Sequence, residues 1–333
     1  MPETGFGASH GWVIFVPSMT EDTIDEELPK QTPKQVAWGI AKTLLKIGFT
    51  GALLYFVFRK IPVADVKKVF LSCDPLYLFL AFLTFVVSQI ISSWRLLGIF
   101  RTIGLDLSFT YNFRLYLLGM FYNLFLPGGI GGDGYKIYLL KKHFSHSGKK
   151  IFWSIMMDRL SGVWALALIA ITLLIFIPQI GFHYSIPLAA FFAGTAIYYF
   201  VVRRFFKDFG PAFVPAHLKA VGVQSFQVIS VILILLGIDF AGKFSPYLFT
   251  FLISSLASIF PLTVGGLGAR EYVFTHASGI FDMNQAIAVF ISISFYLISA
   301  LFSFFGLYFV LRPHRLRHAE QQTTAATDPS TTV

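Results

Sequence analysis

The sequence predicts an all-α fold, a polytopic transmembrane helical bundle of about 6–8 membrane segments. Three observations carry this prediction. Of the 333 residues, 56% are hydrophobic and 13% are charged, whereas a soluble domain carries about 25% charged residues. Several apolar runs reach the ~20 residues that a helix needs to span hydrocarbon. A Gly-rich motif also occurs twice, which predicts two broken or re-entrant hairpins related as an internal repeat.

The apolar runs mark the expected spans in chain order. They are residues 38–58, 76–100, 151–177, 185–202, 218–238, 247–260 and 286–311, with a shorter run at 113–126. The composition of residues 1–37 predicts a disordered or interfacial segment, 38–312 a single transmembrane domain, and 313–333 a disordered cytoplasmic tail. The N-terminal segment has no basic start and no small-residue cleavage site, so we expect no cleavable signal peptide.

Charges between the spans predict the side of the membrane on which each loop lies. The net charge of +9 is carried mainly in short loops, which fits the positive-inside rule and contact with anionic headgroups, so no nucleic-acid partner is expected. Basic loops at 141–150 and 203–207 predict the cytoplasmic side. The basic tail returns to that side only if the two motif segments dip in from opposite faces. The alternative, in which both motif segments are full spans, leaves the tail charges unexplained.

Cysteine and histidine usage argues against metal and hydrolytic chemistry. Cys73 is the only cysteine, so the sequence offers no internal disulfide and no Cys-based zinc site. No His-Glu-x-x-His or Gly-x-Ser-x-Gly motif occurs. We therefore predict no metal site, no cofactor and no catalytic residue, and we expect the protein not to be an enzyme.

The repeated motif places a helix break, glycines and a cation in both halves of the chain. The first copy lies at 123–136, contains Pro127 and ends in Lys136; the second lies at 257–271 and contains Arg270. Proline ends a helix, and glycines permit close approach of a ligand. Freed backbone amides beside a cation suit an anionic ligand, so the duplication predicts a transporter built from two related halves. The alternative is a Gly-rich turn that only closes a helical hairpin.

Charged residues inside the spans extend the candidate site. Each charge costs roughly 2.5–3.5 kcal/mol at the bilayer centre, so Arg270 and Glu271 are expected to face the protein interior. Arg95 and Arg159 are candidates to hold a headgroup phosphate, because a guanidinium binds it in a fork. Asp158 would neutralise one of these arginines when no ligand is bound. The alternatives are structural: snorkelling of Arg95, and ion pairs that only brace the helices.

These arguments give one set of predicted lipid-headgroup residues. Asn123 is included because it lies four residues before Pro127 and can cap carbonyl groups that the break frees. The predicted site comprises Arg95, Asn123, Gly131, Gly132, Asp133, Lys136, Asp158, Arg159, Gly265, Gly266, Gly268, Arg270 and Glu271.

The motif residues resemble those of the lysylphosphatidylglycerol synthase transmembrane-region family of flippase-like membrane proteins. Members show Asn-x-x-x-Pro with a Gly-Gly-acid-x-x-basic run, which residues 123–136 match. They also show Pro-x-x-x-Gly-Gly-x-Gly-x-Arg-Glu, which residues 261–271 match. Asp133 and Lys136 stand where Glu and Arg are usual, which keeps both charges but loses the guanidinium fork.

Two further features of that family recur here in the same order. An Arg near the end of an early span is matched by Trp94-Arg95, and a later acid-Arg pair is matched by Asp158-Arg159. Order and spacing agree across nearly the whole hydrophobic region, so the resemblance implies the same membrane fold.

The resemblance also implies a role in lipid transport. In the bacterial multiple peptide resistance factor, a similar domain translocates an aminoacylated phospholipid and is joined to a soluble transferase domain that has no counterpart in this sequence. We expect a multi-pass protein of the cytoplasmic (inner) membrane that moves an anionic phospholipid, such as an aminoacylated phosphatidylglycerol, or a polyprenyl-linked intermediate. The alternatives are an accessory subunit of a lipid-modifying enzyme or glycosyltransferase encoded nearby, and, less favoured, a phosphatidylglycerol lysyltransferase.

Overall fold

The structure is a computed structural model that describes residues 63–125, 131–144, 146–177, 183, 185–258, 268–312 and 316. These residues belong to one compact unit, Lys42–Val333. The expected span 38–58, the expected terminal segments 1–37 and 313–333 (apart from Leu316), and the predicted site residues Gly265 and Gly266 lie outside the described residues.

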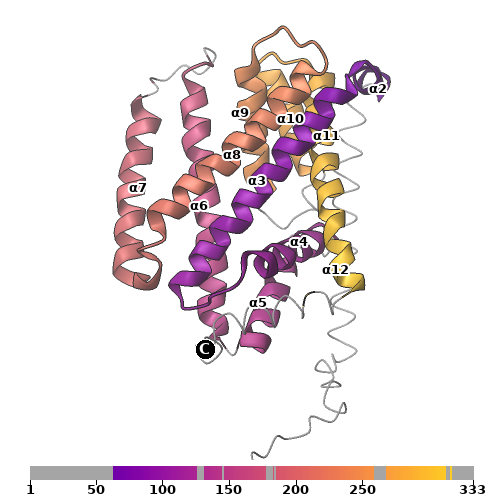
Figure 1. Cartoon of the computed structure of the whole chain (residues 1–333). Helices are drawn as coiled ribbons and strands as arrows, with labels where there is room; N and C mark the ends of the chain where they lie inside the picture. The colour runs from indigo at the N-terminus through magenta and orange to yellow at the C-terminus, as the bar shows by residue number, and fades with distance from the viewer. Residues whose placement is uncertain are drawn as a thin grey trace, which may run out of the picture. The chain divides into compact units, whose positions relative to one another are not determined.

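All regular structure in the described part of the chain is helical, which confirms the all-α prediction (Figure 1). Among the described residues, five helices are long and apolar enough to cross a membrane. They are α3 (Pro75–Thr102), α6 (Gly148–Leu174), α7 (Ser185–Phe205), α8 (Phe213–Leu236) and the continuous segment Gln285–Leu311, which joins α11 (Gln285–Ser303), η3 (Phe304–Gly306) and α12 (Leu307–Leu311). Each coincides with an apolar run in the sequence.

Shorter helices lie between these spans. They are α2 (Val63–Ser72), α4 (Phe109–Phe125), α5 (Gly131–Phe144), α9 (Phe244–Ala257) and α10 (Ala269–Ile280), with the 3-10 turn η2 (Lys207–Phe209). At about 1.5 Å per residue, α5, α9 and α10 are roughly 18–21 Å long. The hydrocarbon core of a bilayer is about 30 Å thick, so none of these three helices crosses it alone.

Helices α3 and α8 pack against each other in opposite directions and form the centre of the unit. Asp74 begins α3 as its N-cap, with its carboxylate accepting the N–H of Leu76 at 2.8 Å and Pro75 following it. At this end, the N–H of Asp74 donates to the carbonyl of Gly237, just past α8, at 2.7 Å. Within the first two turns of α3, the Ser230 hydroxyl on α8 donates to the carbonyl of Ala81 at 2.9 Å. The two helices are therefore held by polar contacts as well as by apolar packing.

The pair formed by α4 and α5 begins and ends at one end of the bundle. A ring nitrogen of His146, just after α5, lies 2.8 Å from the carbonyl oxygen of Ile103, the residue that follows α3 in the connection to α4. The ring centroids of Tyr111 on α4 and Phe144 on α5 are 5.6 Å apart. Since α3 ends and α6 begins near these residues, this pair belongs to that end of the bundle.

The pair formed by α9 and α10 begins and ends at the other end of the bundle. The N–H of Asn284, after α10, donates to the hydroxyl of Tyr247 near the start of α9 at 2.9 Å. Ser245 in turn donates to the carbonyl of Phe176, just past α6, at 2.9 Å. Figure 1 shows α4 and α5 low in the view, and α9 and α10 high. The connections at 126–130 and 259–267 lie outside the described residues, so the Gly-rich breaks and the internal repeat stay predictions.

Candidate functional site

Close backbone contact between α4 and α5 positions the first motif. A methyl group added at Gly132 would overlap the backbone of Gly119, so only glycine fits where the two helices cross. The side-chain oxygen of Asn123 accepts the N–H of Gly132 at 2.8 Å. Asn123 thus satisfies a donor in the first turn of α5, a helix that begins at Gly131, whereas the sequence led us to expect a bond to a carbonyl group.

Asp133 is the centre of a buried ionic cluster at the start of α5. One carboxylate oxygen accepts the Lys136 ammonium at 3.2 Å, one turn further along the same helix. The other oxygen accepts both Nε, at 2.7 Å, and Nη2 of Arg159 from α6. Asp133 is only 8% exposed and Lys136 5%. The Lys136 ammonium also lies 5.0 Å from the ring centroid of Tyr116, within the range of a cation–π contact.

Arg95 and Asp158 form a second buried ion pair, between α3 and α6. Arg95 Nε donates to Oδ1 at 2.7 Å and Nη2 donates to Oδ2 at 3.1 Å, the two-pronged geometry in which a guanidinium binds a carboxylate. Arg95 is 6% exposed, so it does not snorkel to the membrane surface. Its Nη1 is buried and has no hydrogen-bond partner in the part of the chain that the structure describes. Asp158 neutralises Arg95, one of the two arginines that the sequence offered for this role.

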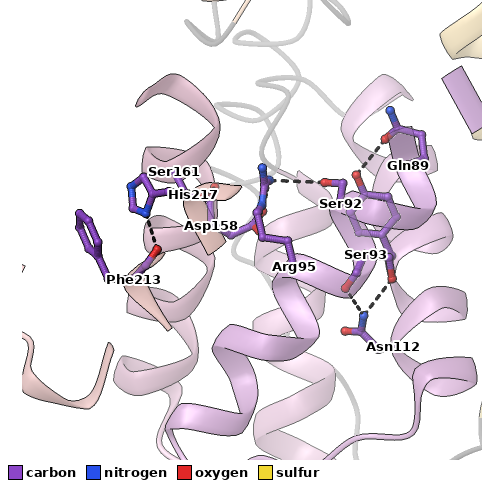
Figure 2. A network of polar contacts seen from close by, with 10 residues as sticks. Gln89, Ser92, Ser93, Arg95, Asn112, Asp158, Ser161, Phe213 and His217 are labelled. Carbon is purple, nitrogen blue, oxygen red and sulfur yellow. Dashed lines mark hydrogen bonds and ion pairs between the residues drawn. The ribbon is translucent and has the colours of Figure 1, made fainter. Parts of the chain in front are cut away.

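Polar side chains on α3 and α4 lie beside Arg95 and Asp158 (Figure 2). The amide nitrogen of Asn112 donates to both the carbonyl and the hydroxyl oxygen of Ser93, at 2.8 and 2.9 Å. The Tyr116 hydroxyl donates to the side-chain oxygen of Gln89 at 2.9 Å. These residues were absent from the sequence prediction. Their signal is a spacing of three residues from Gln89 to Ser92 and again from Ser92 to Arg95, which places polar groups on one face of an apolar helix.

Arg270 is the cation of the second motif, and it lies in the first turn of α10. Its Nε donates to the Ser258 hydroxyl at 2.9 Å and its Nη2 to the Ser255 hydroxyl at 3.2 Å. The guanidinium carbon also lies 5.8 Å from the ring centroid of Phe251 and 5.2 Å from that of Phe295. Arg270 therefore contacts hydroxyl groups and aromatic faces, and no carboxylate in the described part of the chain pairs with it.

Glu271 follows Arg270 directly, yet the two side chains have different partners. One oxygen of Glu271 accepts the N–H of Gly268 at 2.6 Å, and the other accepts the Ser292 hydroxyl on α11 at 2.9 Å. Glu271 is 0% exposed. Gly268 has a φ of +84°, a conformation that favours glycine, and it turns the chain into α10. The carboxylate thus closes the first turn of α10 against α11.

The structure gathers most of the predicted residues into two polar clusters whose members are buried or partly buried. We call the first the α5 cluster; it comprises Arg95, Asn123, Gly132, Asp133, Lys136, Asp158 and Arg159. We call the second the α10 cluster; it comprises Gly268, Arg270, Glu271 and the hydroxyls of Ser255, Ser258 and Ser292. Among the described residues, no group of three or more His, Cys, Asp or Glu side chains could hold a metal ion.

Long apolar helices with charged side chains buried between them define a multi-pass α-helical membrane protein. The chain belongs to the family described as "Lysylphosphatidylglycerol synthase TM region", whose family profile matches residues 43–306. This match confirms the resemblance read from the motifs, and it spans both polar clusters. A comparison with curated proteins found no match.

Proposed function

We propose that this protein moves an anionic phospholipid, or a lipid-linked intermediate, between the leaflets of the cytoplasmic membrane. In this proposal the phosphate of the headgroup contacts the two polar clusters while the acyl chains stay in the bilayer. Membership of a family named for a lipid synthase membrane region supports a lipid-related role. The observation that carries the proposal is Arg270, a cation within the helical bundle that has serine hydroxyls in place of a carboxylate.

The surroundings of Arg270 favour exchange of its partners for a phosphate. A bond between two charged groups is roughly twice as strong as one between neutral groups, and a guanidinium matches the geometry of a phosphate. A phosphate that replaces the hydroxyls of Ser255 and Ser258 would therefore gain binding energy at a site where the cation is already partly desolvated. The rings of Phe251 and Phe295 line the guanidinium and would exclude water from that contact.

The α5 cluster contributes through its net charge. Three cations (Arg95, Lys136 and Arg159) face two carboxylates (Asp133 and Asp158), so the cluster has a net charge of +1. A phosphodiester carries one negative charge and would bring this cluster to neutrality. The buried Nη1 of Arg95 is a donor that a phosphate oxygen could occupy without breaking an existing bond.

The test measures transbilayer movement of a fluorescent anionic phospholipid in liposomes reconstituted with the full-length protein. Arg270→Ala and Lys136→Ala should each abolish movement while purified protein keeps a single, folded species by size exclusion and thermal unfolding. Arg101→Ala is the matched control, because Arg101 is an exposed arginine of α3 outside both clusters. Wild-type rates in folded Arg270→Ala and Lys136→Ala proteins would refute the proposal.

A further inference from the structure

Two basic segments that are far apart in the sequence line one open cavity of about 640 Å³. The first segment is the N-terminal turns of α6, and the second is the connection from the end of α7 through η2. The lining residues are Ser147, Lys149, Lys150, Trp153, Arg204, Phe205, Phe206, Lys207, Asp208 and Phe209. None of them belongs to the α5 or α10 cluster, so this cavity is a separate feature of the molecule.

The cavity has a strong excess of positive charge. Its lining contains four cations and one carboxylate, a net charge of +3. The one carboxylate, of Asp208, already forms an ion pair with Lys150 at 3.1 Å. No carboxylate among the described residues pairs with Lys149, Arg204 or Lys207. The start of α6 adds the partial positive charge of a helix N-terminus on the same side. An anion with more than one negative charge would match the net charge of +3 of the cavity lining.

Aromatic side chains place the cavity at the boundary between apolar and polar surroundings. The ring centroids of Trp153 and Phe206 are 4.7 Å apart, and both rings line the cavity. Phe205 also lines it and is 69% exposed. The helices that carry these residues, α6 and α7, are long and apolar enough to span a membrane, so their ends lie at headgroup depth. Tryptophan is enriched at that depth, and exposed Phe205 would contact acyl chains there.

We infer that this cavity binds the phosphates of an anionic phospholipid as a retained lipid, separate from the lipid that is moved. Basic pockets between membrane helices are suited to headgroups with several phosphate charges. The net charge of +3 favours a lipid with two phosphodiester groups over a lipid with one. The aromatic rim favours a lipid over free inorganic phosphate, because only a lipid buries apolar surface against Phe205 and Trp153.

The test titrates delipidated full-length protein with phospholipids and counts bound lipids by native mass spectrometry. The net headgroup charges of diphosphatidylglycerol, phosphatidylglycerol and phosphatidylcholine are −2, −1 and 0, because the choline ammonium cancels the phosphate charge of the last lipid. The triple variant Lys149→Gln/Arg204→Gln/Lys207→Gln should bind diphosphatidylglycerol at least about tenfold more weakly than the wild type, because the electrostatic attraction falls with each basic residue lost. The charge-keeping variant Lys149→Arg/Lys207→Arg should retain binding.

The matched control removes three other exposed cations. Arg101→Gln/Lys141→Gln/Lys142→Gln leaves the cavity intact and should bind diphosphatidylglycerol as the wild type does. Equal losses in the two triple variants would overturn the inference, as would binding of phosphatidylcholine as tight as that of the anionic lipids. Displacement of the lipid by inorganic phosphate in modest excess would refute the inference that the ligand is a lipid, and would show that the cavity binds a soluble anion. Lipid retention is measured without transport. A wild-type transport rate in Arg270→Ala, which would refute the proposed function, therefore leaves this result unaffected.

Discussion

The α5 and α10 clusters come from closely similar sequence motifs, yet their cations have different partners. Each motif ends in a cation, Lys136 in one and Arg270 in the other. Lys136 lies one helical turn after Asp133 and pairs with it, while the corresponding position before Arg270 is Leu267. In the α10 motif the acid comes one residue after the cation, and adjacent helical residues point in different directions. Arg270 therefore contacts serines, and Glu271 contacts α11.

This difference teaches that the position of the acid, more than the presence of the motif, decides what the cation can do. In the α5 cluster the carboxylates compensate most of the buried positive charge, so the cluster is expected to hold α3, α5 and α6 together. In the α10 cluster the cation keeps weaker, replaceable partners. Substitutions that remove one carboxylate from each cluster test this contrast directly.

Asp133→Asn should have the largest effect, because it leaves Lys136 and Arg159 without their shared carboxylate inside the protein. Removing one partner of a buried ion pair costs about 3–5 kcal/mol. The free energy of unfolding, measured with denaturant in detergent micelles, should fall by that amount. Asp106→Asn is the control: Asp106 is exposed and lies 4.0 Å from exposed Arg101, so its loss should change stability little. A small effect of Asp133→Asn would show that the α5 cluster does not brace the fold.

Gly132→Ala should come next, because the added methyl group would overlap the backbone of Gly119 and force α4 and α5 apart. Overpacking of this kind costs about 1–3 kcal/mol. The melting temperature in detergent should fall clearly for Gly132→Ala. Gly134→Ala provides a matched control two residues further on, since a methyl group there meets nothing within 4 Å. Equal melting temperatures for the two variants would contradict the close contact between α4 and α5.

Asn123→Ala should cost about 1 kcal/mol, the typical loss for one hydrogen bond to a backbone amide. The variant leaves the N–H of Gly132 without its partner at the start of α5. The same unfolding assay measures it, and Asn123→Asp, which keeps the accepting oxygen, should recover most of the loss. A stability unchanged in Asn123→Ala would place that amide in contact with water.

Glu271→Gln should have the smallest effect, less than about 1 kcal/mol, and it gives the sharpest test of the contrast with Asp133→Asn. A glutamine keeps an oxygen to accept the N–H of Gly268, and its NH₂ group can donate to the Ser292 hydroxyl. No ion pair among the described residues is broken in this variant. A loss as large as that of Asp133→Asn would mean that the charge of Glu271 stabilises Arg270 as strongly as Asp133 stabilises its cations, and the two clusters would then be alike.

The sequence was sufficient to predict the long spans and the charges that lie inside the bundle. Apolar length identifies α3, α6, α7, α8 and α11 because membrane thickness fixes the length of a spanning helix. The cost of burying a charge in a membrane likewise singles out Arg95, Asp158 and Arg159 from their positions in apolar runs, although the burial of Arg95 was decided only by the structure.

Partner choice was beyond sequence reasoning because it depends on which helices meet. Asp158 and Arg159 are neighbours in the chain, but their ion pairs go to Arg95 on α3 and to Asp133 on α5. The roles of Gln89, Asn112 and Tyr116 were missed for the same reason, since each becomes meaningful only once α3 and α4 are adjacent. Ser255 and Ser258, which accept hydrogen bonds from Arg270, carry no sequence signal of a charged partner.

The opposite directions of Asp158 and Arg159 have a consequence for motion. Helix α6 forms one ion pair with α3, through Asp158, and a second with α5, through Arg159. Movement of α5 away from α3 must break at least one of these ion pairs, so it would occur as a switch between two discrete arrangements separated by an energy barrier. An anionic headgroup could lower this barrier by taking the place of the carboxylate that leaves its arginine.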